Sequence, residues 1–260
     1  MLTEKALAEL VDPSALDLEA ELDQLARRYR GASGPVIELL NLLGGSAENL
    51  LDRLPQKVRG QLDSATEAAL FAAMRAADKS RDVVSDQPGW FHGALTTVMG
   101  AAGGMGGLPT ALAELPLTTT VLLRDIQGVA VSNGFDPSAE SVQFDCVQVF
   151  ASAGPLAHDD GADMAFLATR MALRGASMQA LIAKVAPRLA HVLGQKLAAQ
   201  SVPLLGAVAG AATNYAYASY YRDMAHVHFR LRRLTIEADA RPEELVAALK
   251  RRVKGPVVAG

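Results

Sequence analysis

Four side chains that can bind a metal gather within six residues of the second half of the chain: His158, Asp159, Asp160 and Asp163. Oxygen ligands of this kind bind hard metal ions. A metal bound here would be consistent with a metal-dependent hydrolase. The same acids also precede a predicted helix over 161–174, where carboxylates cap free N–H groups and interact favourably with the helix dipole. The spacing favours capping over a metal site.

A second polar group interrupts the most apolar parts of the sequence. Glu114 breaks one apolar run, and Arg124 and Asp125 follow it. Asn214 lies inside another such run. Because buried polar groups cost free energy unless they are paired, we expect these four residues to form a polar centre. It either fixes the register of the central helices or lines a polar site in an apolar cavity.

Other signatures of chemistry are absent from the sequence. There is no phosphate-binding loop, no dinucleotide-binding glycine pattern, no nucleophile elbow and no zinc-protease motif. His226 and His228 would point about 200° apart on a helix, so they cannot bind one ion together, and we expect them at the surface or an interface. The lone Cys146 has no basic neighbour and suits a core position. The sequence predicts no cofactor and no catalytic residue.

A basic stripe follows the predicted helix over 177–200. Its members recur at spacings of four, three and four: Lys184, Arg188, His191 and Gln195. The opposite face is apolar: Ile182, Val185, Leu189, Val192 and Leu193. No acid occurs between Arg170 and Tyr221, and such a helix can lie on an anionic membrane. The residues that would meet lipid headgroups are Arg170, Arg174, Lys184, Arg188 and Lys196. The alternative is an ordinary solvated face.

Charge is divided unevenly along the chain. Residues 1–163 carry 23 acids and 11 bases, whereas residues 164–260 carry 5 acids and 14 bases. Either the basic half packs against the acidic half, or it faces an anionic surface such as phospholipid headgroups. The overall charge of −3 makes nucleic acid an unexpected partner.

The composition indicates an all-α protein. Half of the 260 residues are apolar and only 5% are aromatic, and no segment alternates with the period of a strand. We expect a single multi-helix domain over 55–260, preceded by a helical extension over 1–54. The predicted helices cover about 12–30, 35–43, 55–79, 136–150, 161–174, 177–200 with a break or kink at Pro187, 203–233, and a last helix from Arg241-Pro242.

Two long stretches carry no charge, 93–113 and 197–221. Each is long enough to cross a bilayer, but glycine, threonine and tyrosine make them poor spans. Small residues recur at a spacing that lets helices approach closely: Gly103 and Gly107 in the first stretch, Gly206 and Gly210 in the second. We expect two Gly-rich apolar helices packed centrally. Interfacial insertion is the main alternative, and true spans are the least favoured.

Several segments together resemble the EcsC protein family over roughly 55–235. They are Gly-Gly-Met-Gly-Gly-Leu-Pro at 103–109, Glu-Leu-Pro at 114–116, Leu-Leu-Arg-Asp-Ile at 122–126, Gly-Phe-Asp at 134–136, Lys196, Val-Pro at 202–203, Gly-Ala-Val-Ala-Gly at 206–210 and Asn-Tyr at 214–215. The family is named after a gene that accompanies the ATPase and permease of an ABC transporter. It has no agreed catalytic motif and no established biochemical function. The resemblance implies an all-helical bacterial protein, soluble or membrane-peripheral, with links to transport or the envelope.

Three functions stay open at this point. The favoured one is a non-enzymatic, membrane-peripheral or lipid-handling accessory protein whose partner is anionic lipid. The second is a soluble helical module that binds transporter or envelope proteins. The third is a metal-dependent hydrolase. Because the N-terminus lacks the features of a secretory signal, we expect a cytoplasmic protein, free or at the inner face of the membrane.

Overall fold

The structure is a computed structural model that describes residues 17–32, 54–83, 115–152, 177–200 and 206–255, with the single residues 34 and 52. Within these ranges every regular element is a helix, which confirms the all-α prediction. No helix in the described ranges is both long and apolar enough to span a bilayer.

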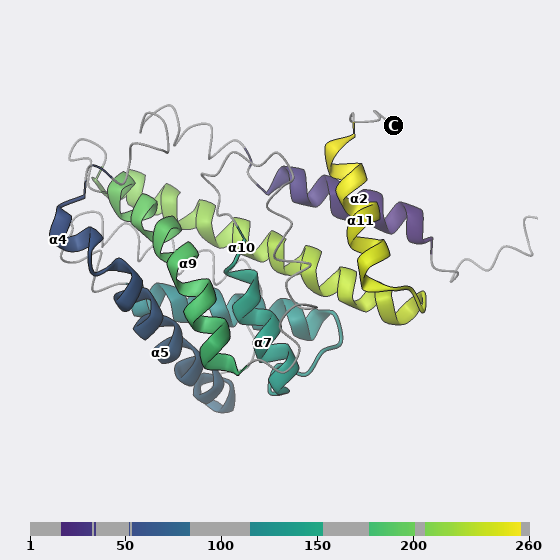
Figure 1. The fold of residues 1–260 in the computed structure, drawn as a ribbon, viewed down its shortest axis with the longest axis horizontal. Helices are drawn as coiled ribbons and strands as arrows, with labels where there is room; N and C mark the ends of the chain where they lie inside the picture. The colour runs from purple at the N-terminus through teal and green to yellow at the C-terminus, as the bar shows by residue number, and fades with distance from the viewer. Residues whose placement is uncertain are drawn as a thin grey trace, which may run out of the picture.

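Most described helices are grouped around one long helix, α10 (Gly206–Glu237), as Figure 1 shows. It contacts α9 (Met178–Gln200), α7 (Glu140–Val149), α2 (Leu18–Gly31) and α11 (Pro242–Lys254). α5 (Leu62–Val83) packs along α9 on the far side and follows the short α4 (Gln56–Arg59). A further helix covers 115–132.

Local sequence explains the ends of the two outer helices. In α2 the Asp17 carboxylate accepts a hydrogen bond from the Ala20 N–H at 3.0 Å, so this helix begins after its cap Asp17, later than the predicted start near residue 12. α11 begins at Pro242, as predicted, with acids in its first turn and bases in its last. Acids in the first turn and bases in the last turn both interact favourably with the helix dipole.

Two predicted helix boundaries are wrong. The helix expected over 55–79 is divided at Gly60 into α4 and α5. At Pro187, where a break or kink is predicted, there is no break, because α9 runs through this residue without interruption. Proline removes one hydrogen bond to the carbonyl four residues earlier. Pro187 and Ala183 are both exposed, so water can satisfy the Ala183 carbonyl.

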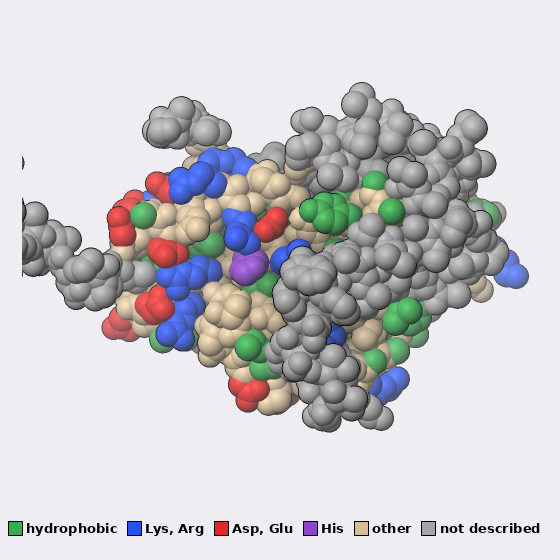
Figure 2. All heavy atoms as spheres, turned by 180° about the vertical axis from the view of Figure 1, so that it is seen from behind, with side chains coloured by type: hydrophobic (Ala, Val, Ile, Leu, Met, Phe, Trp, Pro, Cys, Tyr) green, Lys and Arg blue, Asp and Glu red, His purple; other side chains and the backbone are tan. Residues whose placement is uncertain are grey.

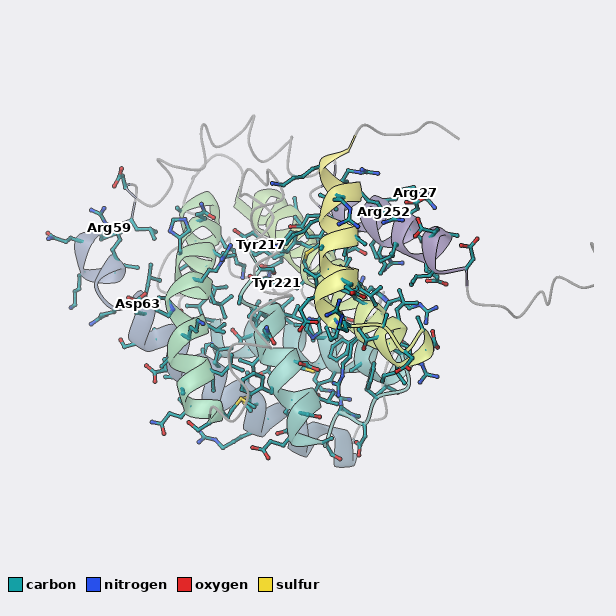
Figure 3. All side chains as sticks on the ribbon, turned by 45° about the vertical axis from the view of Figure 1, so that its right-hand side comes forward. Arg27, Arg59, Asp63, Tyr217, Tyr221 and Arg252 are labelled. Atoms are coloured by element: carbon teal, nitrogen blue, oxygen red, sulfur yellow. The ribbon has the colours of Figure 1, made fainter. Side chains whose placement is uncertain are left out.

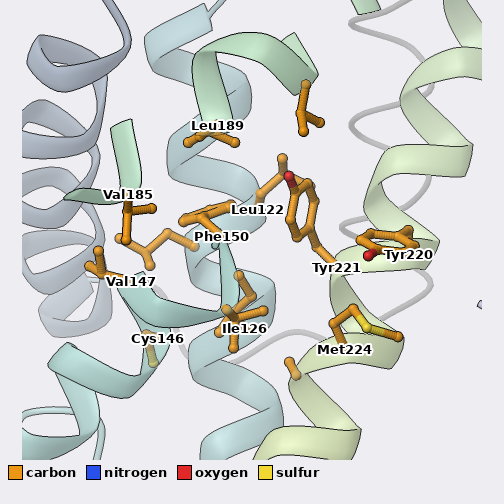
Figure 4. Packing of buried hydrophobic residues seen from close by; sticks show 14 of the residues in the cluster. Leu122, Ile126, Cys146, Val147, Phe150, Val185, Leu189, Tyr220, Tyr221 and Met224 are labelled. Carbon is orange, nitrogen blue, oxygen red and sulfur yellow. The ribbon is translucent and has the colours of Figure 1, made fainter. Parts of the chain in front are cut away.

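The core lies where α7, α9, α10 and the 115–132 helix meet, as Figure 4 shows. The Phe150 ring packs edge-on against the Tyr221 ring, with centroids 5.1 Å apart. One turn earlier on α10, the Tyr217 hydroxyl donates to the Val192 carbonyl of α9 at 3.0 Å. Burial strongly raises the pKa of both tyrosine hydroxyls, so both side chains remain neutral and contribute to packing.

Replacing Phe150 by alanine should destabilise the protein by about 3–5 kcal/mol, because its ring is fully buried and its removal leaves a cavity. Urea unfolding followed by circular dichroism measures this loss. Leu117→Ala is the matched control, since Leu117 is 56% exposed, and should change stability by about 0.5 kcal/mol or less. Equal losses in the two variants would contradict the described core.

Candidate functional site

The outward face of α9 carries the predicted cationic stripe. Lys184 and His191 are exposed, and Arg188 is half-buried. The five apolar residues predicted for the opposite face are at most 2% exposed: Ile182, Val185, Leu189, Val192 and Leu193. The predicted two-faced character of this part of α9 is therefore confirmed. Below, Lys184, Arg188 and His191 are called the outer stripe.

α9 is buried on every side between Val192 and Ala198. Gln195 is 6% exposed and Lys196 is 1% exposed. Lys196 cannot reach a lipid headgroup from this position, so its prediction as a headgroup residue is wrong. Helical spacing continues the outer stripe to Gln195, but this residue is buried.

The described members of the predicted polar centre are buried. Arg124 is 7% exposed, Asp125 5% and Asn214 1%. Asp125 accepts a hydrogen bond from the Arg222 Nε of α10 at 2.8 Å. This ion pair joins the 115–132 helix to α10, which supports the interpretation that the polar residues fix helix register. Sequence reasoning did not include Arg222.

A second buried ionic group, which we call the Asp145 cluster, consists of Asp145, His228 and Arg232. The Asp145 carboxylate is fully buried on α7 and pairs with the Arg232 guanidinium of α10. Its other oxygen lies 3.5 Å from the His228 Nε2. His228 is 5% exposed, so of its two predicted positions, the surface or an interface, the surface is excluded. Because the carboxylate is buried, its ion pair with Arg232 holds α7 against α10.

The turn after the 115–132 helix positions an aromatic ring on this cluster. Gly134 has a φ of +78°, a left-handed conformation that favours glycine. The turn places the Phe135 ring 4.3 Å from the Arg232 guanidinium carbon, a cation–π contact. A side chain at Gly134 would also approach the Arg233 guanidinium at 3.0 Å. Any other residue at position 134 would therefore both strain the backbone and crowd the Arg233 side chain.

Acids of the first half of the chain pair with arginines of the second half across the fold. On α2, Glu21 accepts from the Arg230 Nε at 2.9 Å, and Asp23 accepts from the Arg252 Nε at 2.8 Å. Figure 2 shows acidic and basic side chains interspersed over this end of the molecule. Together with the Asp125 and Asp145 pairs, these contacts confirm that the basic half packs against the acidic half at four arginines.

His226 lies on α10 beside two of these ion pairs. Partial burial is the main cause that lowers its pKa from 6.5 to about 4. The positive charge of Arg28 lowers it further, Asp125 opposes this shift, and Arg222 adds to it. Arg28 itself donates to Asp223 at 3.1 Å. The imidazole is therefore neutral at pH 7.

The remaining predicted site residues lie outside the described ranges. These are Glu114, the metal candidates His158, Asp159, Asp160 and Asp163, the headgroup candidates Arg170 and Arg174, and the close-packing glycines Gly103 and Gly107. Gly206 and Gly210 lie in the first turns of α10, and their close packing stays a prediction. Among the described residues, no three histidines, cysteines or acids come together to hold a metal.

Asp145→Asn should cost about 3–5 kcal/mol of stability, because it leaves the Arg232 charge without its buried partner. Asp52→Asn is the matched control. It breaks an ion pair with Arg59 in which the carboxylate is 74% exposed, and it should cost less than about 1 kcal/mol. Thermal or urea unfolding of both variants tests the difference. If both lose the same stability, the Asp145 cluster does not contribute to packing as described.

The neutral His226 predicts a loss of stability in acid. Above pH 6.5 the imidazole is neutral in the folded and unfolded chain. As the pH falls from 6.5 towards 4, the unfolded chain binds a proton that the folded protein does not, so folding becomes less favourable. His226→Gln should remove this part of the loss, about 1 kcal/mol after solvent screening is considered. Unfolding free energies at pH 7 and pH 4.5 measure it, and an unchanged pH dependence would contradict it.

Comparison with known proteins gives one family. A model of the EcsC protein family matches residues 40–234, beginning earlier than the resemblance seen in the sequence. No curated protein and no solved structure matches the chain. α2 and α11 both lie outside the matched residues. Since the match covers most of its length, this chain belongs to the EcsC protein family.

Proposed function

We propose that this protein is a non-enzymatic, membrane-peripheral accessory protein that binds anionic headgroups at the cytoplasmic face of a membrane. The observation that carries the proposal is the outer stripe of α9. It points Lys184 and His191 into solvent beside the half-buried Arg188, on a helix without a single acid. Cationic side chains near an anionic leaflet each contribute about 1 kcal/mol of attraction.

The contrast between α9 and the other basic helices supports this assignment. On α10 and α11, Arg222, Arg230, Arg232 and Arg252 are engaged by carboxylates. Lys184 has no ion pair within the described part of the structure. The packed core also favours contact with lipid at the protein surface over carriage of a lipid inside the protein. Among the described residues, the hollow lined by α5, α7 and the 115–132 helix is too small to hold a ligand.

A helical module for protein binding is the second candidate function. The specific observation in its favour is the same packed core, which needs no lipid to complete it among the described residues. Such a module would use the outer stripe to bind an acidic protein surface of a transporter or envelope system. The two functions differ in whether protein-free vesicles bind the chain.

Lys184→Glu should weaken binding to anionic vesicles by up to about thirtyfold, because it exchanges one attractive charge for a repulsive one. Co-sedimentation with phosphatidylglycerol-containing vesicles, at increasing salt, provides the measurement. Wild-type binding should decrease as salt screens the headgroups. Lys254→Glu is the matched control, since Lys254 is also exposed but lies on α11.

Three outcomes of this experiment have a clear meaning. Selective weakening by Lys184→Glu supports membrane binding through α9. Equal weakening by Lys254→Glu would show that only net charge matters and would contradict the assignment of α9. A wild-type chain that ignores anionic vesicles even at low salt would contradict membrane binding and favour the protein-binding module.

A further inference from the structure

α2 lies antiparallel along α10 and is joined to it by two ion pairs. Figure 3 shows α2, in purple, beside α11 and at the opposite end of the molecule from Arg59 of α4. Arg28 of α2 donates to Asp223 at 3.1 Å, and Glu21 accepts from Arg230 at 2.9 Å. The second pair lies seven residues earlier on α2 and seven residues later on α10. Since seven residues make almost two helical turns, both pairs use the same face of each helix.

His226 lies between these two pairs, on the face of α10 that receives α2. It follows Asp223 by three residues and precedes Arg230 by four, which is the spacing of neighbours on one helix face. On α2, Leu25 holds the matching position between the two ion-pair residues and is 4% exposed. This register places the half-buried His226 side chain at the contact between the two helices.

The charged groups around the His226 imidazole come from three helices: Arg28 of α2, Arg222, Asp223 and Arg230 of α10, and Asp125 of the 115–132 helix. Burial is the main cause that lowers the pKa of His226 to about 4, and Arg28 is the next. Both causes depend on α2. Release of α2 would return this side of the imidazole to water and remove Arg28, so the pKa would rise towards 6.5.

A proton on His226 and a docked α2 therefore oppose each other. As the pH falls from 6.5 towards 4, a chain with α2 released binds a proton on His226 that the docked chain does not, so release becomes more favourable. We propose that His226 is a pH-sensitive switch between α2 and α10, which keeps α2 docked at neutral pH and favours its release in acid. The switch is independent of the proposed membrane function. Release exposes the apolar residues that α2 buries: Leu22, Leu25, Ala26 and Tyr29.

Asp223 acts in the opposite direction. Burial is the main cause that raises the pKa of its carboxyl above 3.8, and Arg28 and Arg222 offset this only in part. In acid the docked chain therefore binds a proton on Asp223 before the released chain does, which favours docking. A comparison of wild type with a variant of His226 at the same pH values separates the two groups.

Hydrogen exchange of the full-length chain, followed by mass spectrometry at pH 7.5 and pH 5.5, measures the opening of α2. Between these pH values the opening constant of wild type should rise by up to about tenfold relative to that of His226→Gln. His191→Gln is the matched control, since His191 is exposed on α9, and should behave as wild type. Equal pH dependence in wild type and His226→Gln would overturn the proposal. Equal acceleration of exchange in α7 would also overturn it, because the whole protein would then be opening.

A second measurement needs no variant of His226. Because the coupling is reciprocal, loss of α2 docking must raise the affinity of the imidazole for a proton. Leu25→Asp places a charge on the buried face of α2, so the pKa of His226, measured by NMR titration, should rise from about 4 towards 6.5. Gln24→Asp adds the same charge at an exposed neighbour and should leave that pKa close to 4. A pKa that stays near 4 in Leu25→Asp, while the α2 amides exchange freely and the α7 amides remain protected, would contradict the switch.

Discussion

Four arginines of α10 and α11 pair with carboxylates that come from distant parts of the sequence. Arg222, Arg230 and Arg232 lie along one helix and receive acids from the 115–132 helix, α2 and α7. A guanidinium that is withdrawn from water without a partner would oppose folding. Each neighbouring helix must therefore be positioned so that its carboxylate contacts its arginine partner on α10.

This constraint gives the uneven division of charge along the chain a structural role, because acids of the first half neutralise arginines of α10 and α11. At these ion pairs the basic C-terminal half and the acidic N-terminal half pack together as parts of one folded unit. The outer stripe of α9 differs because Lys184 and His191 are exposed, whereas the apolar residues of the helix are buried. That difference gives the outer stripe its significance as a candidate site.

Helical periodicity predicted what depends on a single helix. It identified the buried face of α9, the buried face of α7 around Cys146, and the start of α11 at Pro242. It could not predict which residues of separate helices meet. The burial of Lys196, the partner of Asp125 and the Asp145 cluster all depend on contacts between segments distant in sequence. The spacing of residues within one segment does not indicate which other segments it contacts.

The contact between α2 and α11 joins the two ends of the described chain, and this has a consequence for synthesis. Glu19 and Arg252 are 233 residues apart, so their pairing closes a very long loop. Such contacts form late, because the entropy of loop closure must be overcome first. On the ribosome, α11 emerges after every other described helix. Until then Leu22, Leu25 and Tyr29, which are buried in the finished fold, lack part of their cover. Until α11 emerges, the nascent chain therefore exposes part of the apolar face of α2, a natural target for a chaperone.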